Sequence, residues 1–158
     1  MPVEIHDGIP RSDAELLGVY QEAYPGTQIV PDIDYVYLEL HYSLVDVIFE
    51  LSQNCLHKGA TRVSIHLHPG SLTIEDDFVH SPEEIGPLLD RLNTDKLERR
   101  KNIGETDKDG KVITGGIGIY VSRRTLKKDF NGGILIYVST PDNRIVAQAT
   151  WPVEEVVK

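Results

Sequence analysis

The chain has 158 residues, of which 40% are hydrophobic and 26% charged, a balance that predicts one folded domain and excludes a disordered or fibrous protein. Sixteen basic residues against 25 acidic ones give a formal net charge of −9, so direct binding to nucleic acid or to an anionic membrane is not expected. The single Cys55 excludes an internal disulfide, and without an apolar leader or a membrane-spanning run the sequence predicts a cytoplasmic protein.

The first half of the chain predicts an arm, a long helix and a hairpin. Residues 1–36 form the expected N-terminal arm, around a short helix capped by Ser12 or Asp13. From about Tyr37 to His57, apolar residues recur every three or four positions, which predicts one long helix. Alternating apolar residues and a Pro-Gly turn then predict a hairpin over residues 61–78.

The second half predicts a charged flap, a second long helix and a second hairpin. Residues 79–114 hold seven of the 16 basic residues and one helix, begun by a capping box of Ser81 and Glu84. Glycines then lead into a helix, and residues 132–140 and 143–151 predict an antiparallel strand pair. This order of elements indicates an α+β two-layer sandwich, with helices covering one face of a sheet.

Three polar residues of the first long helix share one side. Glu50 and Asn54 are four positions apart and His57 follows after three, so all three project in similar directions. A carboxamide oxygen can bind Mg²⁺ and a carboxylate can take a proton from water. A solvated helix face would show the same spacing.

A glycine turn at residues 114–118 precedes the second long helix. Gly115, Gly116 and Gly118 would let the backbone approach a ligand closely, and the helix start would favour an anion such as phosphate. The spacing fits neither the dinucleotide fingerprint nor the phosphate loop, and an ordinary tight connection fits equally.

Asp76 ends the second strand of the first hairpin, and its carboxylate could accept a hydrogen bond from an exocyclic amine such as that of adenine. A simple turn is the alternative. His66 and His68 share a strand face, but no cysteine or helical histidine pair accompanies them, so a zinc site is not expected.

In this order, the elements over residues 38–152 resemble the ATP-binding domain of the GHKL, or Bergerat-fold, superfamily. That superfamily includes gyrase B, mismatch-repair ATPases, heat-shock chaperone ATPases and sensor histidine kinases. The stretch from Glu50 to Ile65 is most similar to the mismatch-repair branch. The glycine turn, its helix and the closing hairpin are more similar to a histidine-kinase catalytic domain.

The resemblance implies a mixed, mostly antiparallel sheet within an ATP-binding domain over residues 37–158, with an ATP lid at about 79–114. It also implies roles for single residues. These are a general base at Glu50, a Mg²⁺ ligand at Asn54, a basic residue near the phosphates at His57, adenine recognition at Asp76, and a glycine box at Gly116 and Gly118 closing over the triphosphate. Gly115, in the same turn, is expected to bind ATP as well. The family's two glycines after the adenine-binding aspartate are replaced by Phe78 and His80, whose bulk is expected to narrow the entrance to the base pocket.

The function implied by the resemblance is binding of ATP with Mg²⁺, followed by hydrolysis or transfer of the γ-phosphoryl group. The alternatives are a nucleotide-sensing switch similar to the anti-sigma proteins, and a scaffold that keeps the fold without catalysis. A protein partner is expected, and related ATPases exchange N-terminal segments, so the resemblance also admits a homodimer.

Overall fold

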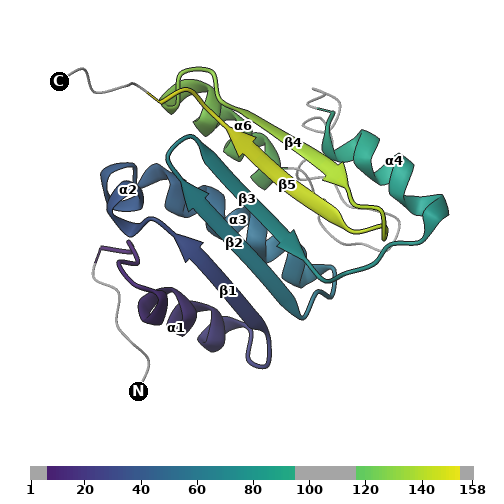
Figure 1. Ribbon diagram of the computed structural model, residues 1–158, viewed down its shortest axis with the longest axis horizontal. Helices are drawn as coiled ribbons and strands as arrows, with labels where there is room; N and C mark the ends of the chain where they lie inside the picture. Colours follow the sequence, from purple (N-terminus) through teal and green to yellow (C-terminus); the bar gives the residue numbers. More distant parts are fainter. Residues whose placement is uncertain (1–6, 95–116, 154–158) are drawn as a thin grey trace.

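The computed structural model describes residues 7–94 and 117–153. Its five strands form one mixed sheet in the order β1-β2-β3-β5-β4, in which β1 and β2 are parallel and the other neighbours antiparallel (Figure 1). The elements in chain order are α1 (Asp13–Ala23), β1 (Gln28–Ile33), α2 (Tyr35–Leu40), α3 (Ser43–His57), β2 (Arg62–His68), β3 (Ser71–Asp76), α4 (Pro82–Leu92), α6 (Ile117–Asp129), β4 (Ile134–Ser139) and β5 (Ile145–Thr150). The expected α+β class and the mostly antiparallel sheet are confirmed.

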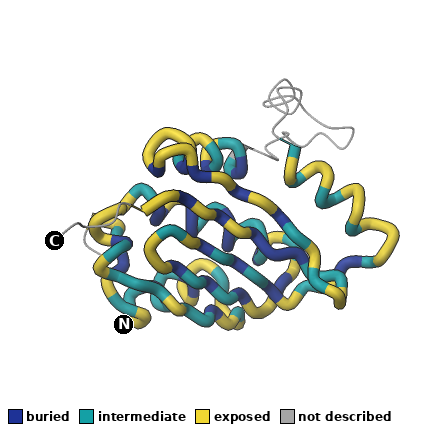
Figure 2. The backbone as a smooth tube through the Cα atoms, turned by 45° about the horizontal axis from the view of Figure 1, so that its top comes forward, coloured by how far each residue is buried: buried dark blue, intermediate teal, exposed yellow. Residues whose placement is uncertain are grey.

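One face of the sheet is buried beneath helices and the other is largely open. On β2, Val63, Ile65 and Leu67 point into the core while their neighbours are partly or fully exposed, as strand alternation requires. The strands and α3 and α6 contribute to one core that continues to α1 (Figures 1 and 2). The predicted two-layer arrangement therefore follows from the alternation of apolar side chains.

The N-terminal segment forms part of this core. Helix α1 begins where expected, with the Ser12 hydroxyl accepting the N–H of Glu15. Its Leu16 and Tyr20 are buried, and so is Ile29 of the following strand. Strand β1 was not anticipated, because its sequence QIVPDI contains a proline and an aspartate. Because β1 is an edge strand, the proline and the aspartate are tolerated there.

The prediction of one long helix from Tyr37 to His57 is wrong in one respect, because the structure divides this segment between α2 and α3. His41 leaves helical geometry with φ −127° and ψ 58°. Its ring packs 4.4 Å from that of Tyr37 and 5.8 Å from that of Phe130, measured between centroids. The break in the helix therefore coincides with a contact between His41 and Phe130, a residue far along the chain. Gly59, with φ +113°, follows α3 as predicted.

Helix α4 flanks the outer edge of β4 (Figure 1). Ser81 is its N-cap, but the expected capping box is wrong, because the serine side chain makes no capping hydrogen bond. The Glu84 N–H bonds to the Ser81 carbonyl instead, at 3.1 Å. No helix in the two described ranges has the length and apolar character needed to cross a membrane.

Candidate functional site

A cavity of about 370 Å³ lies between α3, the sheet and α4, with Ile119 of α6 on its wall. We call it the α3–β3 cavity. Its lining is mostly apolar, and its polar groups come from α3 and the residue after it, from the end of β3, from the segment after β3 and from Tyr137 of β4. The lining residues are Leu51, Asn54, Cys55, Lys58, Ile74, Asp76, His80, Leu88, Leu92, Ile119, Tyr137, Ile145 and Ala147. A site of this size, largely apolar with a few polar groups, suits a small planar ligand.

Asp76 is the buried acid of the cavity. As the last residue of β3 it points to the helical face of the sheet, and its side chain has no exposed surface. Its Oδ1 accepts the N–H of Phe78 at 2.8 Å, so the local turn orients the carboxylate. Its Oδ2 lies 2.8 Å from Lys58 Nζ, yet no donor among the described residues is aligned for a hydrogen bond to it. This oxygen retains acceptor capacity for a ligand.

Lys58 supplies the positive charge at this end of the cavity. Besides Asp76, its Nζ lies 3.5 Å from His80 Nε2 and 5.7 Å from the centroid of the Phe78 ring. Burial, assisted by the lysine charge, lowers the pKa of His80. Burial and the negative charge of Asp76 raise the pKa of the Cys55 thiol, which stays protonated near neutral pH. Asp76 and Lys58, 2.8 Å apart, therefore form the ion pair at this end of the cavity.

Lys58 is not among the site residues predicted from the sequence. The available signal was its spacing, since Lys58 follows Asn54 by four positions and a helix places such residues on one side. The structure does bring Asn54 and Asp76, both singled out from the sequence, to one cavity.

Glu50 lies one turn before Asn54 and is half-buried against the first turn of α6. A Cβ placed on Gly118 would overlap the Glu50 carboxylate. The absence of a side chain at Gly118 is therefore what lets α3 and α6 approach here. The carboxylate stands beside the helix start rather than among the residues that line the cavity.

His57, expected near the phosphates, lies away from the cavity. Its Nε2 lies 2.9 Å from the hydroxyl of Tyr24, at the end of α1. Gly115, Gly116 and the part of the lid from residue 95 to 114 lie outside the described residues. Of the two bulky residues in place of glycines, His80 lines the cavity, while the Phe78 ring rests against Gly59, 3.5 Å from the position of a Cβ there.

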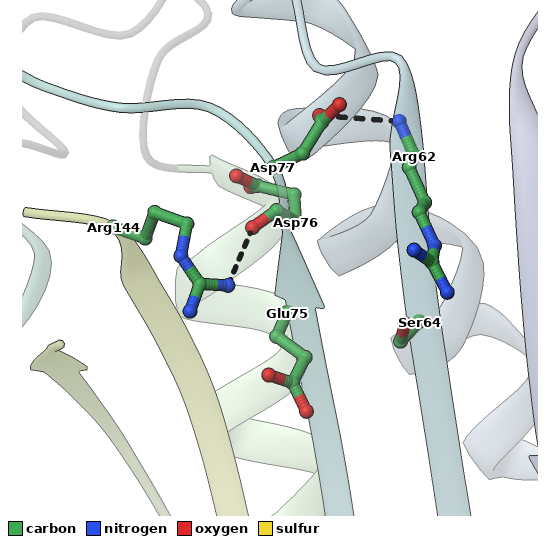
Figure 3. Close-up of a pocket in the computed structure, with 6 residues that line it drawn as sticks. All are labelled: Arg62, Ser64, Glu75, Asp76, Asp77 and Arg144. Atoms are coloured by element: carbon green, nitrogen blue, oxygen red, sulfur yellow. Dashed lines mark hydrogen bonds between the residues drawn. The ribbon is translucent and has the colours of Figure 1, made fainter. Parts of the chain in front are cut away.

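A smaller pocket of about 190 Å³ opens on the other side of β3 (Figure 3). Its charged lining residues are two basic ones, Arg62 and Arg144, and three acidic ones, Glu75, Asp76 and Asp77. Arg144 also donates to the backbone carbonyl of Asp76 at 3.3 Å. This pocket has about half the volume of the α3–β3 cavity and is lined by more acidic than basic residues, which makes the α3–β3 cavity the stronger candidate for an anionic ligand.

The two strand histidines lie on the open face of the sheet. His66 Nδ1 and His68 Nε2 lie 3.2 and 3.0 Å from Asp32 Oδ2, as ion pairs or hydrogen bonds. Within residues 7–94 and 117–153, no group of three or more His, Cys, Asp or Glu side chains is arranged to hold a metal ion. These contacts join β1 to β2.

No protein-family model matches the sequence, and no curated protein matches it. Among solved structures, the chain is similar to the histidine kinase domain of the E. coli osmosensor EnvZ, determined by NMR. The identity is 16%, the TM-score is 0.45, and the match covers 91% of this chain and 89% of that chain.

Proposed function

We propose that this chain binds ATP with Mg²⁺ in the α3–β3 cavity, as a domain of the GHKL type. The observation that carries the proposal is the position of Asp76, a fully buried carboxylate at the end of an apolar cavity, whose Oδ2 is paired with Lys58 but accepts no aligned hydrogen bond from the described residues. An adenine ring would cover the apolar walls and give its amine to that oxygen. Lys58, 2.8 Å from this oxygen, would then share it with the adenine amine.

The residues present fit a magnesium-bound triphosphate. Asn54 offers a neutral oxygen on the cavity wall, one helical turn from Glu50, and the first turn of α6 lies against Glu50. In this proposal Asn54 would hold Mg²⁺, which supplies charge stabilisation for the phosphate oxygens when bound. The start of α6 would favour the negative charge of the phosphates.

Glu50 is the proposed general base. Its carboxylate would take a proton from water for hydrolysis, or from a hydroxyl group of a partner protein for phosphoryl transfer. Gly118 leaves it the room to stand beside the start of α6. With this base in place, an ATPase or an ATP-dependent phosphotransferase is the favoured activity.

A second candidate is a nucleotide-sensing switch that binds ATP without rapid turnover. The observation that favours it is the same position of Glu50, packed against Gly118 and apart from the cavity-lining residues. A base held there would have to move before it could reach a nucleophile. The cytoplasmic location, the protein partner and the homodimer expected from the sequence remain predictions.

Calorimetric titration with ATP and Mg²⁺ tests the binding proposal. We expect Asp76→Asn to weaken binding at least tenfold, because an amide replaces the acceptor oxygen with a weaker or misdirected group. Glu75→Gln is the matched control, since Glu75 precedes Asp76 on β3 but belongs to the opposite face. Absence of heat at millimolar ATP would overturn the proposal and leave a non-catalytic scaffold.

Phosphate release then separates the two candidates. For an ATPase, Glu50→Gln should lower turnover by about 100-fold or more while ATP still binds. Asp46→Asn, one turn earlier on α3 and exposed, should leave turnover unchanged. Turnover that is absent in the unchanged protein, with ATP binding intact, would favour the switch.

A further inference from the structure

The α3–β3 cavity presents a hydrogen-bond donor directly beside its buried acceptor. Lys58 Nζ and Asp76 Oδ2 are 2.8 Å apart, and both residues line the cavity. One group comes from the end of α3 and the other from the end of β3, so two separate elements place them together. A ligand entering this end of the cavity meets both groups.

The lysine is held in place rather than free in solvent. Its side chain is 26% exposed, and its ammonium lies near the ring of Phe78 and 3.5 Å from His80 Nε2 as well as next to the acid. The aspartate is fixed in turn by the N–H of Phe78. This fixation keeps an N–H donor at a defined distance from the acceptor.

The two groups match one edge of an aminopurine. Adenine carries its exocyclic amine, a donor, next to ring nitrogen N1, an acceptor. Asp76 can accept only from the amine, and Lys58 can donate only to the ring nitrogen. Both bonds involve a charged protein group in a largely apolar cavity, where such bonds are strong.

We propose that Lys58 is a specificity residue of this site, and that it reads ring nitrogen N1 of adenine while Asp76 reads the amine. This inference rests on the proposed function. On binding, each group would exchange part of its contact with the other for a hydrogen bond to the base. A base that lacks the ring acceptor leaves the ammonium without this partner, and should bind more weakly.

The test combines a change in the ligand with a change in the protein. The full chain is titrated calorimetrically with Mg²⁺ and either ATP or 1-deaza-ATP, in which a C–H group replaces N1. 7-Deaza-ATP, altered on the other side of the base, is the ligand control. Lys58→Met keeps the aliphatic stem and removes the donor. Lys128→Met is the matched protein control, because Lys128 is exposed on α6 and does not line the cavity.

We expect the unchanged protein to bind 1-deaza-ATP about tenfold more weakly than ATP. Lys58→Met should bind ATP about tenfold more weakly and should bind both nucleotides equally, whereas Lys128→Met should behave like the unchanged protein. Thermal unfolding followed by Trp151 fluorescence shows whether each variant is folded.

Two results would overturn the inference while leaving the proposed function intact. One is ATP and 1-deaza-ATP binding equally to the unchanged protein, a measurement that needs no variant. The other is a Lys58→Met variant that keeps the full penalty for 1-deaza-ATP or binds ATP more tightly, which would make Lys58 a competitor of the base for Asp76. A chain that binds neither nucleotide would overturn the proposed function itself.

Discussion

At the scale of single residues, the size of one side chain determines where a neighbouring charged group can lie. Glu50 keeps its position beside α6 only because Gly118 has no Cβ. Lys58 and His57 are adjacent in sequence, yet one faces the α3–β3 cavity and the other faces Tyr24. A helix turns by about 100° per residue, so adjacent positions serve different surfaces.

We predict that Gly118→Ala displaces the Glu50 carboxylate, because the added methyl group would occupy its place. Phosphate release should fall about tenfold or more, and stability should change little, since alanine favours a helix by about 1 kcal/mol over glycine. Gly86→Ala in α4 is the control, as nothing lies within 4 Å of its added Cβ. Equal turnover in both variants would show that the position of Glu50 is irrelevant to catalysis.

His80 should make stability depend on pH. Burial, with a contribution from Lys58, lowers the pKa of His80 below its ordinary value of 6.5. The unfolded chain therefore binds a proton more readily than the folded protein, and stability is complete above pH 6.5 and decreases as the pH falls from there toward the lowered pKa. Denaturant unfolding between pH 5 and 8 should show a flatter profile for His80→Gln. Identical slopes would remove His80 as the cause.

At the scale of elements, the side chain of Asn93 satisfies backbone groups of β4 at the edge of the sheet. The Asn93 side chain donates to the Tyr137 carbonyl at 2.8 Å and accepts the Tyr137 N–H at 2.7 Å, much as a neighbouring strand would. Arg123 of α6 donates to the Leu92 carbonyl at the end of α4. These contacts hold α4, which provides Leu88 and Leu92 to the cavity, against β4.

We expect Asn93→Ala to lower the free energy of unfolding by about 1–2 kcal/mol, because both backbone groups of Tyr137 lose their partner. It should also weaken ATP binding, since α4 forms a wall of the cavity. Arg91→Ala, an exposed change in the last turn of the same helix, should cost less than about 0.5 kcal/mol. Urea unfolding and nucleotide titration measure both effects, and a neutral Asn93→Ala would contradict the proposed role of the edge contacts.

At the scale of the whole molecule, one core joins the N-terminal elements to the rest. Leu16 and Tyr20 of α1 belong to the same cluster as Trp151 beyond β5. The Tyr20 hydroxyl is hydrogen-bonded to Ser52 of α3, and burial raises the pKa of Tyr20. Residues 7–36 thus pack as part of the described fold.

Leu16→Ala should therefore destabilise the entire protein, by about 2–5 kcal/mol. Trp151 fluorescence and far-ultraviolet circular dichroism should report the same shifted urea midpoint, although Trp151 lies at the other end of the chain. Val36→Ala, at a position 72% exposed, should shift neither. Separate transitions for the two probes would show that the N-terminal segment unfolds independently.

Local patterns were sufficient for most of the secondary structure and for the α+β class. Periodicities of two and about 3.6 depend on neighbouring residues alone, and so do the N-cap at Ser12 and the turn at Gly59. The same periodicity placed Glu50 and Asn54 on one side of a helix. Periodicity did not predict β1 or the break at His41, because partners distant in the sequence stabilise both.

Only the tertiary structure decided which helix face meets the end of β3. The resemblance seen in the sequence implied roles in one ATP site for Asn54 and Asp76, and the fold places both residues on one cavity. The fold also directs Lys58, and not His57, toward this cavity. The reason is that packing of the whole apolar stripe of α3 on the sheet sets the rotation of the helix about its axis. Spacing along a chain fixes which residues share a face, and long-range packing determines what that face touches.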